Sequence, residues 1–242
     1  GIIDWFLARQ VDGILWAVPE IGSNRDWVEA LFDDINVPII FLTSAERENI
    51  SIVTIDNYLG ARLATEHLIN SGCKRIGHIS GPMDWWESRQ RFQGWQDALV
   101  EAGIETEGRM TAEGNWSSRS GKEAFSQLRA SFPEMDSVFV ANDQMSLGVL
   151  QTACNENLAI PEQFSVVGFD NIPESEFFSP SLTTVYQNLD KLGSVAVEEL
   201  ARMVEASNSG KELGKQIYLT IKPELIVRRS TRNGEVEKEV QG

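Results

Sequence analysis

The chain has 242 residues, with 21 Lys and Arg against 36 Asp and Glu, so its net charge at pH 7 is −15. A protein this acidic repels phosphate groups, so we expect it not to bind nucleic acid unaided. Hydrophobic residues make up 42% and charged residues 24%, which are globular proportions and exclude wholesale disorder. No apolar run approaches the roughly 18 residues that span a bilayer, so we expect no membrane span and no membrane partner. Two cysteines, Cys73 and Cys154, suggest neither a metal cage nor a disulfide framework, and the cytoplasm is the expected compartment.

The chain starts at Gly1 rather than at a methionine, and residues 1–10 have the pattern of the end of an amphipathic helix. An apolar run at 11–18 then predicts a buried strand. A helix is expected at 24–34 and a second strand at 37–42. Because the sequence begins as if it were cut within a longer chain, the lack of a signal-peptide pattern carries little weight.

Strands and helices alternate through the rest of the chain. The expected strands are 51–55, 75–79, 109–112, 137–141, 164–169 and 182–186, and the expected helices are 58–71, 84–103, 118–130, 143–156 and 189–206. Such alternation predicts an α/β fold with parallel sheets that are covered on both faces. These eight strands are many for one sheet, so two sheets in two lobes are expected.

The inner faces of two helices can be read from their apolar spacing. In the helix at 143–156 the expected inner stripe is Leu147, Leu150 and Cys154. In the helix at 189–206 the stripe is formed by Leu189, Leu192, Ala196, Leu200 and Met203. The tail at 233–242 lacks apolar periodicity and is expected to be disordered.

Pairs of Asp, Asn or Gln follow four of the expected strands: Asp56-Asn57, Asn142-Asp143, Asp170-Asn171 and Gln187-Asn188. In open parallel sheets ligands bind beyond the carboxyl ends of the strands, so these side chains should converge on one rim. Asn and Asp are also good N-caps for the following helix. In each pair we therefore expect one member to cap and the other to face the cleft, since capping alone explains four such pairs poorly.

Aromatic and basic side chains accompany these strand ends. Trp85, Ser88 and Arg91 lie three residues apart at a helix start, and Trp116 lies in a loop between a strand and a helix. Vicinal hydroxyls of a neutral polyol suit Asp, Asn and Arg, and its C–H faces suit a flat ring. Core packing is the alternative for one of Trp85 and Trp86, and a surface ion pair is the alternative for Arg91. Together the residues favour a polar organic ligand, most of all a sugar.

Catalytic and metal sites find little support. His67 and His78 lie eleven residues apart, on a helix and a strand, and neither makes a spaced ligand pair. Nucleophile-elbow, zinc-protease, P-loop and dinucleotide motifs are missing, and neither cysteine has a neighbouring base. We therefore predict a protein that is not an enzyme and that has no cofactor and no metal.

Six segments form a specific combination: DNYLGARLATEHLINSGCKRIGHISGP (56–82), SRQRFQGWQDAL (88–99), FVANDQMSLGVLQ (139–151), FSVVGFDN (164–171), SPSLTTVYQNLDKLG (179–193) and LIVRRST (225–231). In these segments the chain resembles the effector-binding core of the LacI/GalR family of bacterial transcription regulators, which is related in fold to periplasmic sugar-binding proteins. The resemblance spans nearly the whole chain.

The resemblance implies two Rossmann-like lobes of the type I periplasmic-binding-protein fold, joined by three crossovers near 55–57, 186–189 and 213–218. Residues 1–55 and 188–215 would form the N-terminal lobe, and residues 56–187 and 216–232 the C-terminal lobe. By the same resemblance the helix-turn-helix domain, the hinge and the first strand of the core are missing from this chain. A central strand position of the N-terminal lobe would then be empty, and the lobe would carry exposed edges.

The resemblance also implies the effector site. Its contacts would be Arg91, Trp116, Asn142, Asp170 and Gln187, and Trp85, Glu87, Thr43, Ile55 and Leu189 would line the pocket. Thr43, Ile55 and Leu189 depart from the pattern of the lactose-binding members, and Trp85 and Trp86 replace small residues. No particular sugar can therefore be carried over.

The expected function is that of a sugar-sensing domain of a transcription regulator, most often a repressor in this family. A mono- or disaccharide between the lobes would control operator binding by the missing DNA-binding domain, in a homodimer that uses the first helices of each lobe. The alternative is an extracytoplasmic sugar-binding protein of an ABC uptake system. The segments SLTTVYQ (181–187) and LIVRRST (225–231) favour the regulator.

Overall fold

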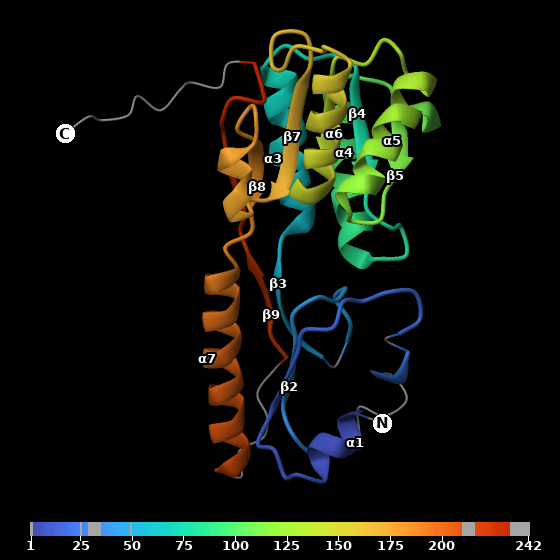
Figure 1. Ribbon diagram of the computed structural model, residues 1–242. Helices are drawn as coiled ribbons and strands as arrows, with labels where there is room; N and C mark the ends of the chain where they lie inside the picture. The colour runs from blue at the N-terminus through green and yellow to red at the C-terminus, as the bar shows by residue number, and fades with distance from the viewer. Residues whose placement is uncertain (1, 25, 29–34, 49, 210–215, 233–242) are drawn as a thin grey trace, which may run out of the picture. The chain divides into compact units, whose positions relative to one another are not determined.

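The computed structural model describes residues 2–24, 26–28, 35–48, 50–209 and 216–232. The chain forms two compact units, one of residues 1–55 and 188–221 and the other of residues 56–187 and 222–242 (Figure 1). It passes from one unit to the other after Ile55, after Gln187 and after Ile221. Each unit has its own parallel-dominated sheet with helices packed on it, so the predicted α/β fold with two sheets is confirmed.

The first unit contains a four-stranded parallel sheet. Its strands lie in the order β1 (Ile14–Trp16), β2 (Ile39–Phe41), β3 (Ser51–Ile55) and β9 (Tyr218–Ile221). Side chains alternate between the two faces, as the period of a strand requires. Ile39, Phe41 and Ile52 pack on one face, where helix α1 (Ile2–Leu7) also contributes apolar side chains. Ile40 and Val53 pack on the other face, against helix α7 (Leu189–Asn208).

Two predictions about the first unit are wrong. Residues 216–221 are expected in the C-terminal lobe, but β9 lies alongside β3 with Val53 opposite Leu219, so this segment belongs to the first unit. The expected empty position inside the sheet does not occur among the described strands, because each strand is hydrogen-bonded directly to the next. The short β9 has largely exposed side chains, and the sequence pattern does not predict it as a strand.

The second unit contains a six-stranded sheet in the order β10-β8-β7-β6-β4-β5. These strands are β4 (Ile76–Ser80), β5 (Thr111–Glu113), β6 (Ser137–Val140), β7 (Ser165–Asp170), β8 (Thr183–Tyr186) and β10 (Glu224–Ile226). All neighbours are parallel except β10, which pairs antiparallel with β8 and is not among the predicted strands.

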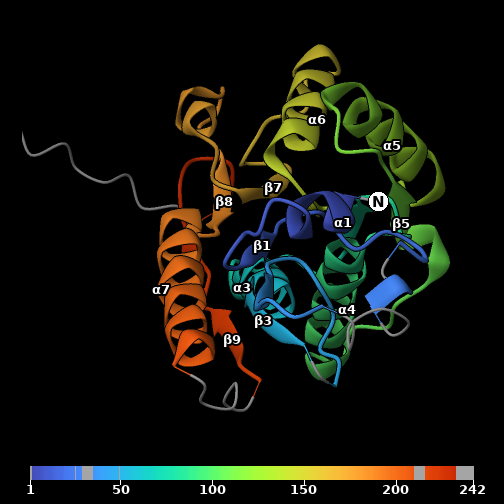
Figure 2. The same ribbon diagram turned by 90° about the horizontal axis from the view of Figure 1, so that it is seen from below.

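Four helices sandwich the sheet of the second unit. They are α3 (Asn57–Asn70), α4 (Trp86–Glu101), α5 (Ser118–Ser131) and α6 (Asp143–Asn155), and short 3₁₀ helices occur at η2 (Gly108–Met110) and η3 (Pro173–Phe177). Helices α3 and α4 cover one face and α5 and α6 the other (Figure 2). The core between these layers is one continuous apolar cluster, which includes Phe139, Phe169 and Trp95.

The inner stripe predicted for α6 is wrong in two of its three members. Leu147 is 41% exposed and Cys154 is exposed, whereas Leu150 is buried as predicted. The buried face carries Met145, Val149 and Ala153 instead. Helix α5 comes closest to α6 at Gly148, where a Cβ atom would lie 2.0 Å from the carbonyl oxygen of Ser118. Leu189, the first residue of α7, is also exposed rather than part of the inner stripe.

Two further predictions concern residues outside the described ranges. The helix expected at 24–34 includes 25 and 29–34, and the tail expected to be disordered is 233–242; neither set is described.

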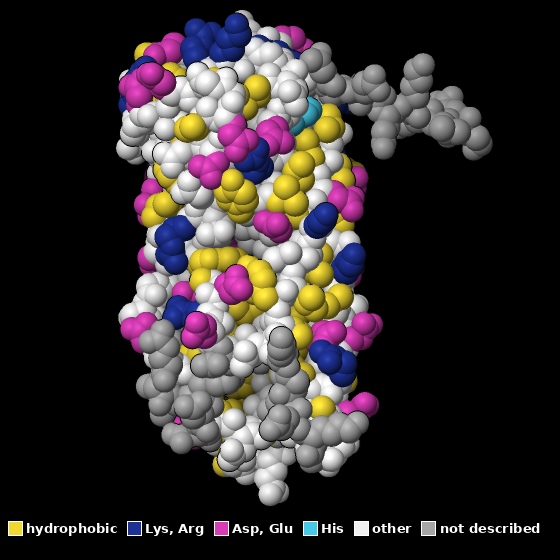
Figure 3. Space-filling view, turned by 180° about the vertical axis from the view of Figure 1, so that it is seen from behind, with side chains coloured by type: hydrophobic (Ala, Val, Ile, Leu, Met, Phe, Trp, Pro, Cys, Tyr) yellow, Lys and Arg dark blue, Asp and Glu magenta, His cyan; other side chains and the backbone are white. Residues whose placement is uncertain are grey.

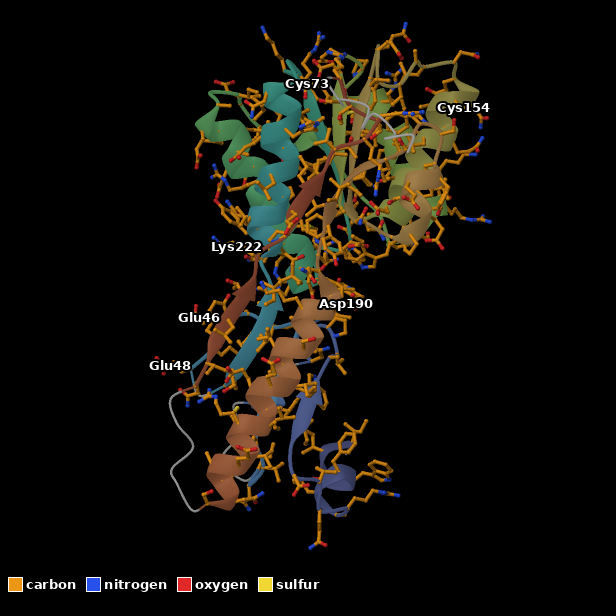
Figure 4. The ribbon with its side chains drawn as sticks, turned by 90° about the vertical axis from the view of Figure 1, so that its left-hand side faces the viewer. Glu46, Glu48, Cys73, Cys154, Asp190 and Lys222 are labelled. Carbon is orange, nitrogen blue, oxygen red and sulfur yellow. The ribbon has the colours of Figure 1, made fainter. Side chains whose placement is uncertain are left out.

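In the described part of the chain no helix has the length and hydrophobicity needed to cross a bilayer. The buried Cys73 follows α3 and the exposed Cys154 lies on α6 (Figure 4). On the face in Figure 3, Lys and Arg side chains are scattered among Asp and Glu side chains.

Candidate functional site

Five parallel strands of the second unit end at one rim of its sheet. They are β4, β5, β6, β7 and β8, whose registers are all parallel. Seven predicted site residues lie at these strand ends or in the segments that follow: Trp85, Glu87, Arg91, Trp116, Asn142, Asp170 and Gln187. Loops at the carboxyl ends of parallel strands are where open α/β sheets bind ligands. We call this set of residues the rim site.

Arg91 is the central cation of the rim site. It is only 5% exposed, its Nε donates a 2.8 Å hydrogen bond to Asn57 Oδ1, and its Nη1 donates to the carbonyl of Ala141. Nη1 also lies 3.6 Å from Asp170 Oδ1, and the guanidinium lies 3.8 Å from the ring centroid of Phe169. Burial lowers the pKa of Arg91, and neighbouring carboxylates oppose this shift. Arg91 is therefore not part of a surface ion pair, which is the alternative that the sequence leaves open.

Asp170 is the carboxylate that faces Arg91. It is the last residue of β7, with φ at 111°, and Gln187 Nε2 donates a hydrogen bond to its Oδ1. Burial raises the pKa of Asp170 to about 6, and Arg91 and Gln187 limit this rise. Near neutral pH the rim site therefore holds a charged pair, with polar hydrogen-bonding atoms close together.

Two tryptophans form an aromatic corner beside this pair, since the ring centroid of Trp116 lies 5.7 Å from the guanidinium carbon of Arg91. The rings of Trp85 and Trp116 lie 5.5 Å apart at an interplanar angle of 65°. Trp116 lies directly over Gly81, where a Cβ atom would be 2.1 Å from the ring. Its Nε1 is buried without a hydrogen-bond partner in the described part of the protein. By contrast Trp86 is buried, so of these two neighbouring tryptophans Trp86 is the structural one.

Asn142 holds the loop that carries Trp116. Its Nδ2 donates to the carbonyl of Trp116 at 3.0 Å and to Gln144 Oε1 at 2.9 Å, and its Oδ1 accepts from the amide of Met145. Both amide protons are thus used within the protein, which leaves one lone pair of Oδ1 for a ligand. Asn142 therefore acts first as a cap and as an anchor of the Trp116 loop.

The four strand-end pairs divide their roles unequally. Asp56, Asn142 and Asn188 cap α3, α6 and α7 with their side chains, as the prediction of one cap in each pair requires. At the third pair neither residue caps, because Asp170 and Asn171 both adopt positive φ and the cap position of η3 is Ile172. The partners of the caps point inward: Asn57 contacts Arg91, Gln187 contacts Asp170, and Asp143 is fully buried.

Sequence reasoning missed several residues that shape the rim site. Asn57, the carbonyl of Ala141 and the ring of Phe169 all contact Arg91. The sequence does contain a signal for Asn57, since it belongs to one of the four strand-end pairs. No sequence signal identified Phe169, because an apolar residue before a strand end resembles any other core residue. Glu87 lies buried in the first turn of α4, close enough to affect the pKa of Arg91.

Three predicted pocket residues belong to the first unit and are described there by themselves. Thr43 Oγ1 donates to the carbonyl of Val18 at 2.9 Å. Ile55 is buried at the end of β3 and packs in the cluster beneath α7. Leu189 is 59% exposed at the start of α7. Their role in ligand binding stays a prediction.

Both histidines are packed as structural residues. His67 Nε2 lies 2.9 Å from Thr231 Oγ1. His78 stacks between the rings of Phe139 and Trp95, and burial lowers its pKa to about 3. Across the described ranges, no three His, Cys, Asp or Glu side chains are grouped so that they could hold a metal ion.

The fold and the rim define a class, and comparison with known proteins agrees. Residues 65–231 match the family of the periplasmic binding protein-like domain. The chain is 32% identical over 232 residues to the HTH-type transcriptional repressor PurR of Actinobacillus pleuropneumoniae serotype 3 (strain JL03), a match that covers 96% of this chain and 67% of that protein.

Two solved structures are similar over most of this chain. The complex of the transcriptional regulator CelR with cellobiose is 30% identical with a TM-score of 0.82, and the match covers 95% of this chain and 68% of that one. A sugar-binding transcriptional regulator of the LacI family from Escherichia coli, in complex with phosphate, is 27% identical with a TM-score of 0.81, over 94% of this chain and 80% of that one.

The protein is thus a periplasmic-binding-protein-like effector-binding domain. It belongs to the LacI/GalR family of bacterial transcription regulators, as the resemblance predicted, and it is the effector-binding domain of a LacI-family transcriptional repressor. These relatives are transcription regulators rather than enzymes or uptake proteins, so the alternative of an ABC-system sugar-binding protein is not retained.

Proposed function

We propose that the rim site binds a neutral mono- or disaccharide. The observation that carries this proposal is the placement of the Arg91–Asp170 pair beside the aromatic corner of Trp85 and Trp116. The charged pair offers donors and acceptors for adjacent hydroxyls, and the rings offer a flat surface for the C–H face of a sugar. One structural relative is a complex with cellobiose and another is described as sugar-binding, which supports the same ligand class.

A thermal-shift screen of mono- and disaccharides, with cellobiose first, tests this function. A ligand at 100 times its dissociation constant adds about 2.7 kcal/mol of stability. For a chain of this size we expect a rise in Tm of about 5–10 °C, since each kcal/mol corresponds to about 2–4 °C. A panel in which no saccharide shifts Tm, while a nucleobase or an anion does, would contradict the proposal.

Trp116 provides a second test, because its ring centroid lies 5.7 Å from the guanidinium carbon of Arg91. A saccharide that packs on the ring removes water from it and should change the intrinsic fluorescence of the protein. The same titration on Trp116→Phe should give a much smaller change, which comes from Trp85 in the same aromatic corner. Trp86→Phe is the matched control, since Trp86 is buried and should leave the response intact. A response of undiminished size in Trp116→Phe would argue against the stacking role of Trp116.

We also propose that the sugar controls operator binding by a helix-turn-helix domain, within a homodimer in the cytoplasm. Such coupling is typically worth about 1–3 kcal/mol and acts equally from sugar to operator and from operator to sugar. The exposed apolar residues Ile2 and Trp5 on α1 support a dimer that uses the first helix of the first unit. With its net charge of −15, this 242-residue chain should bind operator DNA only through that further domain.

A further inference from the structure

A fully buried carboxylate lies directly behind the rim site. Asp143 is the first residue of α6, and its Oδ1 accepts a 2.6 Å hydrogen bond from the hydroxyl of Thr184 on β8. Its Oδ2 accepts from the backbone amide of Ile172 at 2.9 Å. Strand β7 passes close to it, since a Cβ atom on Gly168 would lie 2.3 Å from Asp143 Oδ1. The fold therefore leaves room for this carboxylate and gives each of its oxygens a donor.

One of these donors, the amide of Ile172, belongs to the turn that follows β7, and the other, Thr184 on β8, accepts a hydrogen bond from that turn. Asp170 and Asn171 have φ values of 111° and 53°, in the left-handed region that residues with side chains rarely adopt. The amide of Asn171 donates to Thr184 Oγ1 at 3.3 Å, and the next amide, that of Ile172, donates to Asp143. Two successive amides of a strained turn are thus held by the Asp143–Thr184 pair. From the other side, Arg228 Nη2 donates to Asn171 Oδ1 at 2.8 Å.

We propose that Asp143 is a positioning residue of the rim site, which holds the left-handed turn at Asp170–Asn171 and thereby aims the carboxylate of Asp170 at Arg91 and Gln187. Asp143 acts through this turn and is not a ligand contact itself. The inference rests on the proposed function, because the aim of Asp170 matters for binding only if the rim site takes the ligand.

The proposal makes the turn depend on the protonation of Asp143. The charged groups around its carboxylate are Asp170 on β7, Arg91 on α4 and Arg228 beyond β10, and β8 contributes the neutral Thr184. Burial raises the pKa of Asp143 to about 7, against the hydrogen bond from Thr184. The ionised carboxylate accepts from both donors, whereas protonation turns one oxygen into a donor and weakens one of these bonds. The turn should therefore loosen as the pH falls through about 7.

The contribution of Asp143 itself to global stability has the opposite pH dependence. The folded-state pKa of Asp143 lies above its ordinary value, so its contribution to stability is fully present at low pH. That contribution is lost as the pH rises through about 7. A loosening of the turn on acidification would therefore not follow from the contribution of Asp143 to global stability, and the Met145 amide reports any general unfolding.

Amide hydrogen exchange of the full chain, followed by NMR without any ligand, tests the proposal. The variants are Asp143→Asn, Thr184→Val and the conservative Thr184→Ser. In Thr184→Val we expect the protection factor of the Asn171 amide to fall about tenfold or more, and in Asp143→Asn that of the Ile172 amide to fall likewise. Thr184→Ser should keep wild-type protection, and the Met145 amide, which Asn142 caps, should stay unchanged throughout.

The pH profile completes the test. The wild-type protection factors of Asn171 and Ile172, corrected for intrinsic exchange, should fall between pH 8 and pH 6, and those of Asp143→Asn should not. Unchanged protection in both Asp143→Asn and Thr184→Val overturns the proposal, as does an equal loss at Met145, which would show a merely structural role. Because no ligand is added, the exchange experiment tests the role of Asp143 even if no saccharide binds in the thermal-shift screen.

Discussion

Replacing Asp170 by alanine, or Arg91 by alanine, is expected to weaken saccharide binding about 10- to 150-fold. Each residue would make hydrogen bonds to the sugar from a charged group, and such bonds are worth about 1.5–3 kcal/mol. The two residues are also each other's counter-ion at 3.6 Å, so the loss of one leaves the other buried without its partner. Isothermal titration calorimetry with the saccharide found by the thermal-shift screen measures the effect.

Arg89→Ala is the matched control for Arg91. Arg89 lies on the same helix and is exposed, and its guanidinium donates to the carbonyls of Met83 and Asp84. Its loss should leave the affinity unchanged. The affinity of the wild type should also fall as the pH drops below about 6, where Asp170 becomes protonated. If the alanine variants of Arg91 and Asp170 both retain wild-type affinity, the rim site is not where the ligand binds.

Gly148→Ala is expected to destabilise the second unit by about 1–3 kcal/mol. Gly148 lies on α6 where it crosses α5, and a Cβ atom there would lie 2.0 Å from the carbonyl oxygen of Ser118. Backbone atoms of α5 cannot move aside as a flexible side chain can, so the two helices must separate. This cost outweighs the gain of about 1 kcal/mol that alanine has over glycine in a helix. Thermal or urea unfolding followed by circular dichroism measures the difference.

Gly193→Ala separates the contact from the general effect of the substitution. Gly193 lies in α7 of the first unit, and outside the backbone of its own helix a Cβ atom there would meet no atom of the described residues within 4 Å. This variant should be neutral or slightly stabilised, by about 0.4–1 kcal/mol, because alanine lowers the entropy of the unfolded chain. A Gly148→Ala protein as stable as the wild type would mean that α5 and α6 have room between them for a methyl group.

The fold was largely predictable because its strands are buried and apolar and its helices are periodic. The strands that escaped prediction are β9 and β10, which are short and have few buried side chains. Without β9 the third passage between the units was placed too early, near 213–218 rather than after Ile221. Such a segment becomes a strand because it pairs with a strand that is distant in the sequence, in this case β3. The local sequence does not show which strand this will be.

The sequence predicts that the candidate site residues lie at one edge of the sheet. It does not predict which of them cap helices and which point inward. Asn and Asp are equally good caps, so the pair Asn142-Asp143 could not show which residue would cap and which would turn inward. In the structure Asn142 caps, and Asp143 is buried behind Asp170. The positive φ of Asp170 and Asn171 was also beyond sequence reasoning, since no glycine marks that turn.

The triple passage of the chain means that neither unit is a continuous piece of polypeptide. Residues 56–187 supply most of the second unit, but Ser230 returns to it, where its backbone and hydroxyl bond to Val166 and its hydroxyl accepts from the amide of Thr183. A single proteolytic cut in α7 would therefore leave two fragments that still share both units. Shortening the chain to residues 1–221 would remove Ser230 from the second unit while leaving the first unit its full set of residues.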